Sequence, residues 1–364
     1  MNDVYLNRIA TAVPDHDVHT AFVDFADNLL SESPDPRMRA LFNRMASRSG
    51  IQHRYSILSP HRDAPEDHTS EFWINAHRFY TRGSFPDTSN RMEIFERFAP
   101  VLMRRAVDRL ELTPAERRSI THVVVTTCTG LYAPGLDFDV VDHLGLCPSV
   151  ERTMIGFMGC YAAINGLKTA RHIIRSEPHA RVLMVNLELC SLHLQESHDL
   201  EQVLSFLLFA DGCAASILSA EPIGLALDSF RAVTIPETRE LITWKIRGLG
   251  FDMFLSGQVP SAIAKGLESC SEDIVGPFTA DDITLWGVHP GGRTILDGVE
   301  RGLGLPPEAL TSSRSVLERF GNMSSATVMF VLDDIMRTAQ PGERGCAMSF
   351  GPGLTAETML FHAA

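Results

Sequence analysis

The stretch GFMGCYAAINGLKTARHIIR, residues 156–175, places a cysteine between a glycine and an aromatic residue at the start of a helical pattern. Unpaired backbone N–H groups and the positive end of the helix dipole favour a thiolate at such a position. We therefore predict a pKa for Cys160 below the free-thiol value of about 8.5. A nearby imidazole would lower it further and complete a Cys/His nucleophile pair. The alternative is a small buried residue, which most reduced cysteines are.

The surroundings of Cys160 occur twice in the chain. Each copy runs strand, loop, a helix opened by glycine and a polar residue, then two strands, and the opening pairs are Gly159-Cys160 and Gly321-Asn322. Apolar and β-branched runs bounded by turn signals predict the strands. These runs are 121–127, 180–189, 213–220, 283–288, 346–350 and 358–361.

Alternating strands and helices predict a layered α/β protein. We expect two similar halves, residues 1–221 and 222–364, merged in one core because no low-complexity linker separates them. Cys160 and Asn322 then occupy equivalent corners of the two halves. The first hundred residues are polar and helical in pattern, and are harder to interpret.

The composition is that of a soluble globular protein, with 45% hydrophobic and 21% charged residues among 364. A formal net charge of −13 argues against binding to nucleic acid or to an anionic membrane. The first residues lack the features of a secretory signal and no apolar run is long enough to span a membrane, so we expect a cytoplasmic protein. Seven cysteines without CxxC spacing predict neither a disulfide framework nor a zinc site.

Two further polar residues are candidates for the reaction centre. His289 ends a buried-looking strand in LWGVHPGG, and the following Pro-Gly-Gly turn leaves its imidazole at the edge of the sheet. A simple strand end is the other interpretation. Asn322 stands where asparagine is a preferred helix N-cap, and this role is compatible with a catalytic amide.

Six short motifs resemble those of the thiolase-fold condensing enzymes, and most closely the chalcone synthase-like type III polyketide synthases. The resemblance covers the chain from about residue 44 to residue 361. It implies a thiolase-like α/β fold, internally duplicated, with αβαβα layers. The motifs are TTCTGLYAPGLD (126–137), MGCYA (158–162), LFADG (208–212), WGVHPGG (286–292), FGNMSSA (320–326) and SFGPGLTAET (349–358).

The resemblance assigns roles to residues of this sequence. Cys160 would take an acyl group from a coenzyme A thioester, while His289 and Asn322 would stabilise the enolate from malonyl-CoA and the oxyanion of condensation. Phe209 and Phe251 would separate the coenzyme tunnel from the reaction cavity. The implied homodimer would place the loop around Ala133 in the partner's cavity. Further cavity residues would be Glu188, Cys190, His193, Ser324 and Pro352.

The sequence departs from the plant pattern at several of these positions. Arg44 and Arg48 match basic residues at the tunnel mouth that pair with phosphates, but a third position, usually lysine, is Leu41. Cys190 and His193 stand where the plant enzymes have small hydroxyl residues. We expect Cys190 to share a face of its strand with Glu188, whereas alternation does not fix the direction of His193. Starter and product therefore cannot be carried over from the plant relatives.

The leading prediction is iterative condensation of malonyl-CoA onto an acyl-CoA starter, ending in a pyrone, resorcinol or phloroglucinol-type product. The alternatives are a ketoacyl synthase III-like single condensation onto a carrier protein and a noncatalytic acyl-thioester-binding relative. No GxGxxG or GxxxxGK[ST] motif indicates a nucleotide cofactor, so we expect none beyond coenzyme A thioesters. We also expect no metal site, since neither residues 61–77 nor the pair His193/His198 has the spacing of metal ligands.

Overall fold

A computed structural model describes residues 3–33, 35–61, 71–72 and 74–364. The strands are β1 (Tyr5–Ala12), β2 (His16–Asp17), β3 (Tyr55–Ser56), β4 (Leu58–Ser59), β5 (Ile74–Asn75), β6 (His122–Thr127), β7 (Glu151–Gly156), β8 (Val182–Leu189), β9 (Asp211–Ser219), β10 (Leu225–Thr234), β11 (Ile242–Arg247), β12 (Gly250–Leu255), β13 (Leu285–Val288), β14 (Arg344–Gly351) and β15 (Thr355–Ala363).

The α-helices are α1 (His19–Ser31), α2 (Pro36–Ala46), α3 (Ala76–Phe79), α4 (Thr88–Asp108), α5 (Pro114–Ser119), α6 (Leu136–Leu144), α7 (Ala162–Ser176), α8 (Leu200–Leu208), α9 (Val259–Val275), α10 (Arg293–Leu303), α11 (Thr311–Phe320) and α12 (Thr327–Met336). Short 3₁₀ turns are η1 (Gly159–Tyr161), η2 (Cys190–His193), η3 (Ala280–Asp282), η4 (Pro307–Leu310), η5 (Ser324–Ala326) and η6 (Pro352–Leu354).

Within the described residues, nine strands form one sheet in the order β13-β14-β15-β10-β1-β9-β8-β6-β7. The order is nearly symmetric about the β10–β1 pair. On one side β6 and β8 are parallel and β8 and β9 antiparallel, and on the other β13 and β14 are parallel and β14 and β15 antiparallel. The two copies of the sequence pattern thus fold alike, and the sheet continues through both.

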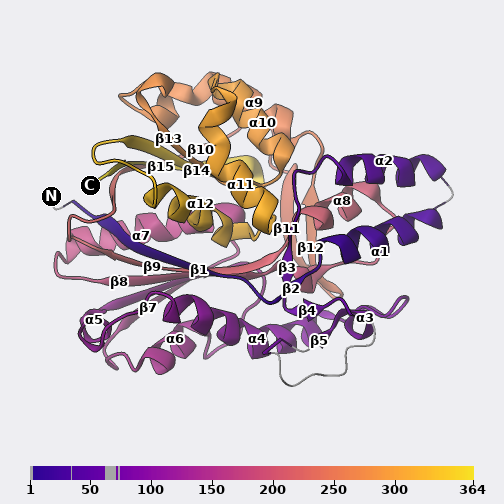
Figure 1. The fold of residues 1–364 in the computed structure, drawn as a ribbon, viewed down its shortest axis with the longest axis horizontal. Helices are drawn as coiled ribbons and strands as arrows, with labels where there is room; N and C mark the ends of the chain where they lie inside the picture. Colours follow the sequence, from indigo (N-terminus) through magenta and orange to yellow (C-terminus); the bar gives the residue numbers. More distant parts are fainter. Residues whose placement is uncertain (1–2, 34, 62–70, 73) are drawn as a thin grey trace.

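The layers follow from the burial pattern of the strands and the helices between them. In Figure 1, α4 and α6 lie below the strands of the first half, α7 and α12 lie between the two sets of strands, and α9 and α10 lie above the second set. Every residue of β6, β8 and β9 is buried, because helices cover both faces. The layered α/β fold predicted from the sequence is confirmed.

The first hundred residues contain helices, as their pattern predicted, in α1, α2, α3 and the start of α4, but they also contain the strand β1, which that prediction did not include. β1 pairs with both β9 and β10 in the middle of the sheet. Its sequence, YLNRIATA, alternates too irregularly to identify a strand, and its strand partners are more than 200 residues away in the chain. Among the described residues, we find no helix with the length and hydrophobicity that a bilayer crossing needs.

Candidate active site

Cys160 lies in η1, a short 3₁₀ turn directly before α7, whereas the sequence pattern predicted the first turn of the helix itself. The preceding residue must be glycine, because Gly159 has a φ of +75° and an added Cβ would lie 2.3 Å from Cδ of Pro352. The Gly159 amide donates to Sγ of Cys128 at 3.0 Å. The thiol is therefore presented at the carboxyl end of β6, where the loop after that strand meets η6.

Asn322 occupies the equivalent corner of the second half. Gly321 has a φ of +69°, and an added Cβ would lie 2.9 Å from the carbonyl oxygen of Leu208. The Asn322 amide oxygen accepts from the backbone N–H of Ser324 at 2.8 Å, and its amide nitrogen donates to the carbonyl of Gly291 at 3.3 Å. Asn322 thus orders the start of η5 as a capping residue would, although the N-cap position itself is Met323.

His289 follows β13 and reaches the same region. Its backbone N–H donates to the carbonyl of Met348 at 2.7 Å, and it is 1% exposed. Neither ring nitrogen has a hydrogen-bond partner among the described residues. Burial lowers the pKa of His289 to about 3, so the ring is neutral and offers one donor and one acceptor. The carbonyl of Gly291, two residues on, is the one that binds the Asn322 amide.

The prediction of a lowered thiol pKa is wrong for this site. Burial raises the pKa of Cys160 to about 12, since taking the thiolate out of water outweighs the contacts that favour it. Those contacts are the Ser324 hydroxyl, 3.7 Å from Sγ, and the Asn322 amide, while the charge of Glu188 raises the pKa further. A short 3₁₀ turn precedes α7, so Cys160 does not occupy the first turn of the α-helix itself.

A narrow apolar cavity opens at Cys160. Phe209, Cys190, Ser324 and Pro352 line it, as the resemblance implied, together with Trp244 and Met253. Phe209 is fixed by its backbone, because its carbonyl accepts from the buried guanidinium of Arg54 at 2.6 Å. Trp244 and Met253 face each other across β11 and β12. Sequence reasoning missed both, since this hairpin has no motif of its own.

Phe251 and His193 do not line this cavity. Phe251 is 2% exposed and stacks on the imidazole of His193 with a centroid distance of 4.2 Å and an interplanar angle of 13°. Trp244 meets both rings edge-on. His193 is fully buried, so the alternative of a surface imidazole is wrong. Its two ring nitrogens have protein partners, which leaves neither for a metal ion.

Glu188 also lies away from the cavity surface. It is fully buried and accepts three hydrogen bonds, from the Cys128 amide at 2.9 Å and from the hydroxyls of Thr129 and Ser325 at 2.8 and 2.6 Å. The period-two argument that paired it with Cys190 is wrong, because β8 ends at Leu189 and Cys190 begins η2. The turn, rather than the strand, directs Cys190 into the cavity.

A second, wider cavity is lined by the two predicted coenzyme-binding residues, Arg44 and Arg48. Arg293, the first residue of α10, lines the same cavity and donates to the carbonyl of Arg48 at 3.3 Å. Leu41 lies there too and is 45% exposed. Sequence reasoning missed Arg293, although an arginine directly after HPGG at a helix start was a visible signal.

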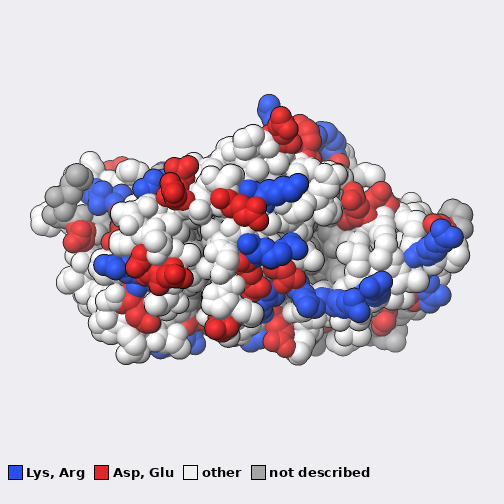
Figure 2. All heavy atoms as spheres, turned by 90° about the horizontal axis from the view of Figure 1, so that it is seen from above, with Lys and Arg blue, Asp and Glu red and all other residues white. Residues whose placement is uncertain are grey.

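The distribution of charged side chains on the surface is consistent with anion binding at the opening of this second cavity. Figure 2 looks down on the side that carries α2, α9 and α10, and Lys and Arg side chains gather toward the right, where α2 lies in Figure 1. Elsewhere on this face acidic and basic side chains are intermixed. A chain with a net charge of −13 therefore keeps a local basic patch. Ala133 lies apart from these cavities, in an exposed loop after β6.

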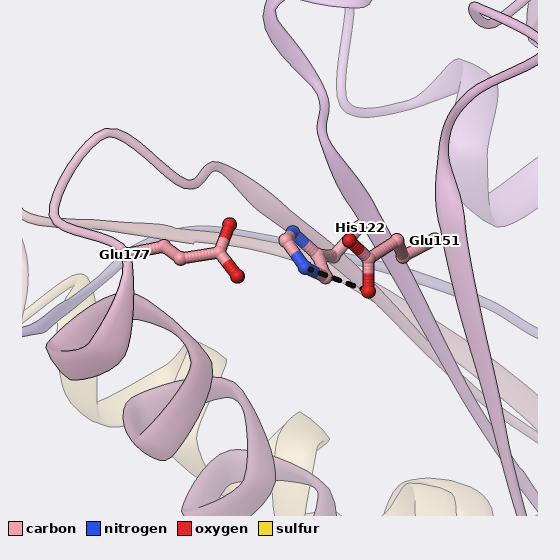
Figure 3. A group of neighbouring side chains, drawn as sticks. All are labelled: His122, Glu151 and Glu177. Atoms are coloured by element: carbon pink, nitrogen blue, oxygen red, sulfur yellow. Dashed lines mark ion pairs between the residues drawn. The ribbon is translucent and has the colours of Figure 1, made fainter.

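A group of possible metal ligands lies at the other end of β6 (Figure 3). His122, Glu151 and Glu177 bring their ligand atoms within 4.8 Å of one another. Nε2 of His122 lies 3.7 Å from a carboxylate oxygen of Glu151, and the two side chains form an ion pair when the ring is protonated. The carboxylates of Glu151 and Glu177 are both exposed. Exposed acidic groups of this kind are common in proteins without a bound ion. Of the acidic segment 61–77, residues 62–70 and 73 lie outside the described residues.

Comparison with known proteins covers nearly the whole chain. The family description "Chalcone and stilbene synthases, N-terminal domain" matches residues 4–222, and the corresponding C-terminal domain matches residues 227–364. Bisdemethoxycurcumin synthase of Oryza sativa subsp. japonica is 33% identical over 98% of this chain and 91% of its own. The alpha-pyrone synthesis polyketide synthase-like Pks18 of Mycobacterium tuberculosis is 31% identical over 98% of this chain and 90% of its own.

Solved structures agree with these relatives. The polyketide synthase PKS-I of the brown alga Ectocarpus siliculosus matches with a TM-score of 0.87 and 30% identity, covering 100% of this chain and 99% of its own. The C-terminal type III polyketide synthase domain of Steely1 from Dictyostelium matches with a TM-score of 0.86 and 26% identity over the same shares. The fold is thus thiolase-like, and the chain belongs to the chalcone and stilbene synthase family of type III polyketide synthases, which are acyltransferases.

Proposed function

We propose that this protein catalyses repeated decarboxylative condensation of malonyl-CoA onto an acyl-CoA starter held on Cys160. The observation that supports this most is His289, a neutral buried imidazole whose two ring nitrogens have no hydrogen-bond partner in the part of the chain that the structure describes. His289 lies two residues before Gly291, whose carbonyl accepts from the Asn322 amide. The Asn322 amide oxygen in turn accepts from the backbone N–H of Ser324, and the Ser324 hydroxyl lies 3.7 Å from Sγ of Cys160. Unpaired buried polar groups are costly, so a site that keeps them is suited to receive substrate oxygen or a proton.

The first step is acyl transfer to the thiol. His289 accepts the Sγ proton as Cys160 attacks the thioester carbonyl, a tetrahedral oxyanion forms and collapses, and coenzyme A leaves as a thiol after regaining that proton. Proton transfer from a neutral thiol to a neutral imidazole creates no net charge. Burial therefore opposes the resulting ion pair less than it opposes either ion alone.

The second step is carbon–carbon bond formation. The thioester carbonyl of malonyl-CoA accepts hydrogen bonds from the Asn322 amide and from N–H of His289, so loss of CO₂ leaves a stabilised enolate. The enolate carbon attacks the acyl thioester on Cys160, the Cys160 thiolate departs, and a chain two carbons longer remains on coenzyme A. Transfer of this product back to Cys160 begins the next round. Coenzyme A thioesters are the substrates, and we propose no cofactor.

The shape of the cavities supports an aliphatic starter of medium or long chain. Cys190, Phe206 and Phe209 line both the cavity at Cys160 and a neighbouring apolar pocket. Phe22, Phe25, Leu58 and Leu194 are among the other apolar residues that line that pocket. A thiol at Cys190 tolerates apolar contact, so an acyl chain that passes it finds a hydrophobic environment. The relative Pks18, named for alpha-pyrone synthesis, makes a pyrone the first product to look for.

The outer edge of the sheet supports a homodimer. β7 is an edge strand whose residues are mostly exposed, and Leu131, Phe138 and Met154 are large exposed apolar residues on or near it. Such an edge is a ready template for pairing with a second copy. The loop of Ala133 would then face the partner. A monomeric mass in solution would contradict this proposal. We place the protein in the cytoplasm, where coenzyme A thioesters are available.

Purified protein incubated with malonyl-CoA and a panel of acyl-CoA starters tests the proposed function. We expect CO₂ release and products longer than the starter by mass spectrometry, without added carrier protein. Condensation only when malonyl-carrier protein is supplied would identify the ketoacyl synthase III-like reaction instead. The absence of both CO₂ release and product with every substrate would favour the noncatalytic alternative.

A further inference from the structure

His193 connects two segments that are distant in the sequence. Its Nε2 lies 2.6 Å from the carbonyl oxygen of Thr129, in the loop after β6, and its Nδ1 accepts from the backbone N–H of Phe251, in β12, at 3.1 Å. A carbonyl only accepts and an amide N–H only donates, so Nε2 carries the proton and Nδ1 does not. The partners therefore allow one neutral tautomer.

The turn that carries His193 is itself rigidly held. The guanidinium of Arg91, which is fully buried, donates to the carbonyls of Leu192 and Leu194 on either side of His193. At the other end of η2, the carboxylate of Asp211 accepts from the amide and hydroxyl of Ser191. Burial lowers the pKa of His193 to about 3, with the nearby Arg91 charge acting in the same direction, so the ring stays neutral.

The loop that His193 holds borders the thiol. Cys128 and Thr129 both line the cavity at Cys160, and Sγ of Cys128 accepts from the amide of Gly159. Two ring N–H groups hold consecutive carbonyls of this loop: Nε1 of Trp244 donates to Cys128 at 2.8 Å, and His193 donates to Thr129. A shift of His193 would therefore displace the cavity wall beside the nucleophile.

We propose that His193 is a positioning residue that fixes Phe251 and the Cys128–Thr129 loop and thereby closes one side of the reaction cavity. The stack of His193 and Phe251 leaves no space behind the cavity on that side, since both residues are almost fully buried. The growing chain is therefore directed past Cys190, which begins the same turn and lines both the cavity at Cys160 and the adjoining apolar pocket. This inference rests on the proposed function and goes beyond it by assigning the direction of chain growth to a residue that touches no substrate.

Two variants separate the hydrogen bonds of His193 from its volume. His193→Phe keeps an aromatic ring against Phe251 but leaves the Thr129 carbonyl and the Phe251 amide unpaired. His193→Gln keeps a side-chain donor at about the place of Nε2. His122→Gln is the matched control, because it removes a buried imidazole at the far end of β6.

With malonyl-CoA and a medium-chain acyl-CoA, we expect kcat to fall about tenfold or more in His193→Phe, with KM within about twofold of wild type. Product lengths should shift away from the wild-type pattern. His193→Gln should recover part of both effects, and His122→Gln should change neither. Wild-type kcat and product pattern in His193→Phe would overturn the proposal and leave His193 a purely structural residue.

A second measurement does not depend on turnover. The rate of Cys160 alkylation by iodoacetamide at fixed pH should change about threefold or more in His193→Phe and stay unchanged in His122→Gln, because only the first moves the loop beside the thiol. Equal rates in all three proteins would overturn the proposal. Failure of the wild type to condense malonyl-CoA with any starter would overturn the proposed function. Normal condensation by the wild type, with the same activity and alkylation rate in the His193 variants, would overturn only this inference.

Discussion

The hydroxyl of Ser325 donates a hydrogen bond of 2.6 Å to the carboxylate of Glu188, and this bond joins the two halves of the fold beside the proposed reaction centre. Glu188 belongs to β8 of the first half and Ser325 to η5 of the second, three residues after Asn322. The same carboxylate holds the amide of Cys128. One buried acid thus fixes the loop beside Cys160 and the turn after Asn322 relative to each other.

Glu188→Gln should change how stability depends on pH. Burial raises the pKa of Glu188 to about 7 from its ordinary value of 4.5, so the folded protein holds this proton more tightly than the unfolded chain. The associated stability is complete below pH 4.5 and is lost as pH rises through 7. The unfolding free energy of the Gln variant relative to wild type should therefore rise between pH 5 and 7.5. A constant difference in urea titrations across that range would contradict the assigned pKa.

Cys160→Ala should abolish polyketide formation and leave the fold intact, because it removes the nucleophile and little packing. Decarboxylation of malonyl-CoA should partly survive, since His289 and Asn322 remain. Product by mass spectrometry, CO₂ release and thermal melting are the measurements. Cys213→Ala, at a buried cysteine of β9, is the control for loss of a thiol. Normal product from Cys160→Ala would disprove the acyl-enzyme.

His289→Ala should slow alkylation of Cys160 and shift its midpoint to higher pH. The neutral imidazole is the proposed acceptor of the thiol proton, and burial opposes the thiolate once that acceptor is gone. Iodoacetamide labelling followed by peptide mass spectrometry gives the rate at each pH. Glu188→Gln should shift the midpoint the other way, because it removes a negative charge that raises the thiol pKa. Identical profiles for wild type and His289→Ala would rule out the thiol–imidazole pair.

Cys190→Trp should reduce activity with medium and long aliphatic starters more than with acetyl-CoA. Cys190 lines both the cavity at Cys160 and the adjoining apolar pocket, and a close-packed wall cannot absorb an indole without filling the passage. Product length across the starter panel is the measurement, with Cys190→Ala as the control. Equal loss for short and long starters would indicate general damage, and unchanged profiles would show that the acyl chain takes another path.

Arg293→Ala should raise KM for malonyl-CoA about three- to tenfold with little change in kcat, because a cation at the tunnel mouth contributes binding energy to a phosphate remote from the chemistry. Arg293 donates to the carbonyl of Arg48, and both line the same cavity as Leu41. Leu41→Lys should lower KM in both backgrounds. Arg118→Ala, at an exposed arginine of α5 that does not line this cavity, is the control. Unchanged KM in Arg293→Ala would exclude it from coenzyme binding.

The sequence by itself determined the fold class and the duplication, and it singled out the three polar residues that we propose for the reaction centre. Gly159-Cys160 and Gly321-Asn322 could be identified because each corner requires a left-handed glycine before a polar residue at a helix start, which is a local requirement. The strands of the duplicated units could be identified because burial on both faces makes them continuous apolar runs. Local order in the chain was enough for these features.

Only the tertiary structure decided how the side chains around that centre are used. β1 is a central strand because β9 and β10 flank it, and nothing within YLNRIATA shows this. Arg293 forms a hydrogen bond with the carbonyl of Arg48, 245 residues away in the sequence. Glu188 and His193 are buried and form hydrogen bonds with residues 58 to 137 positions away. The pKa of Cys160 is raised rather than lowered for the same reason. The position of a residue near a helix start can be read from the local sequence, whereas the loss of water around the thiol depends on all the segments that pack against it.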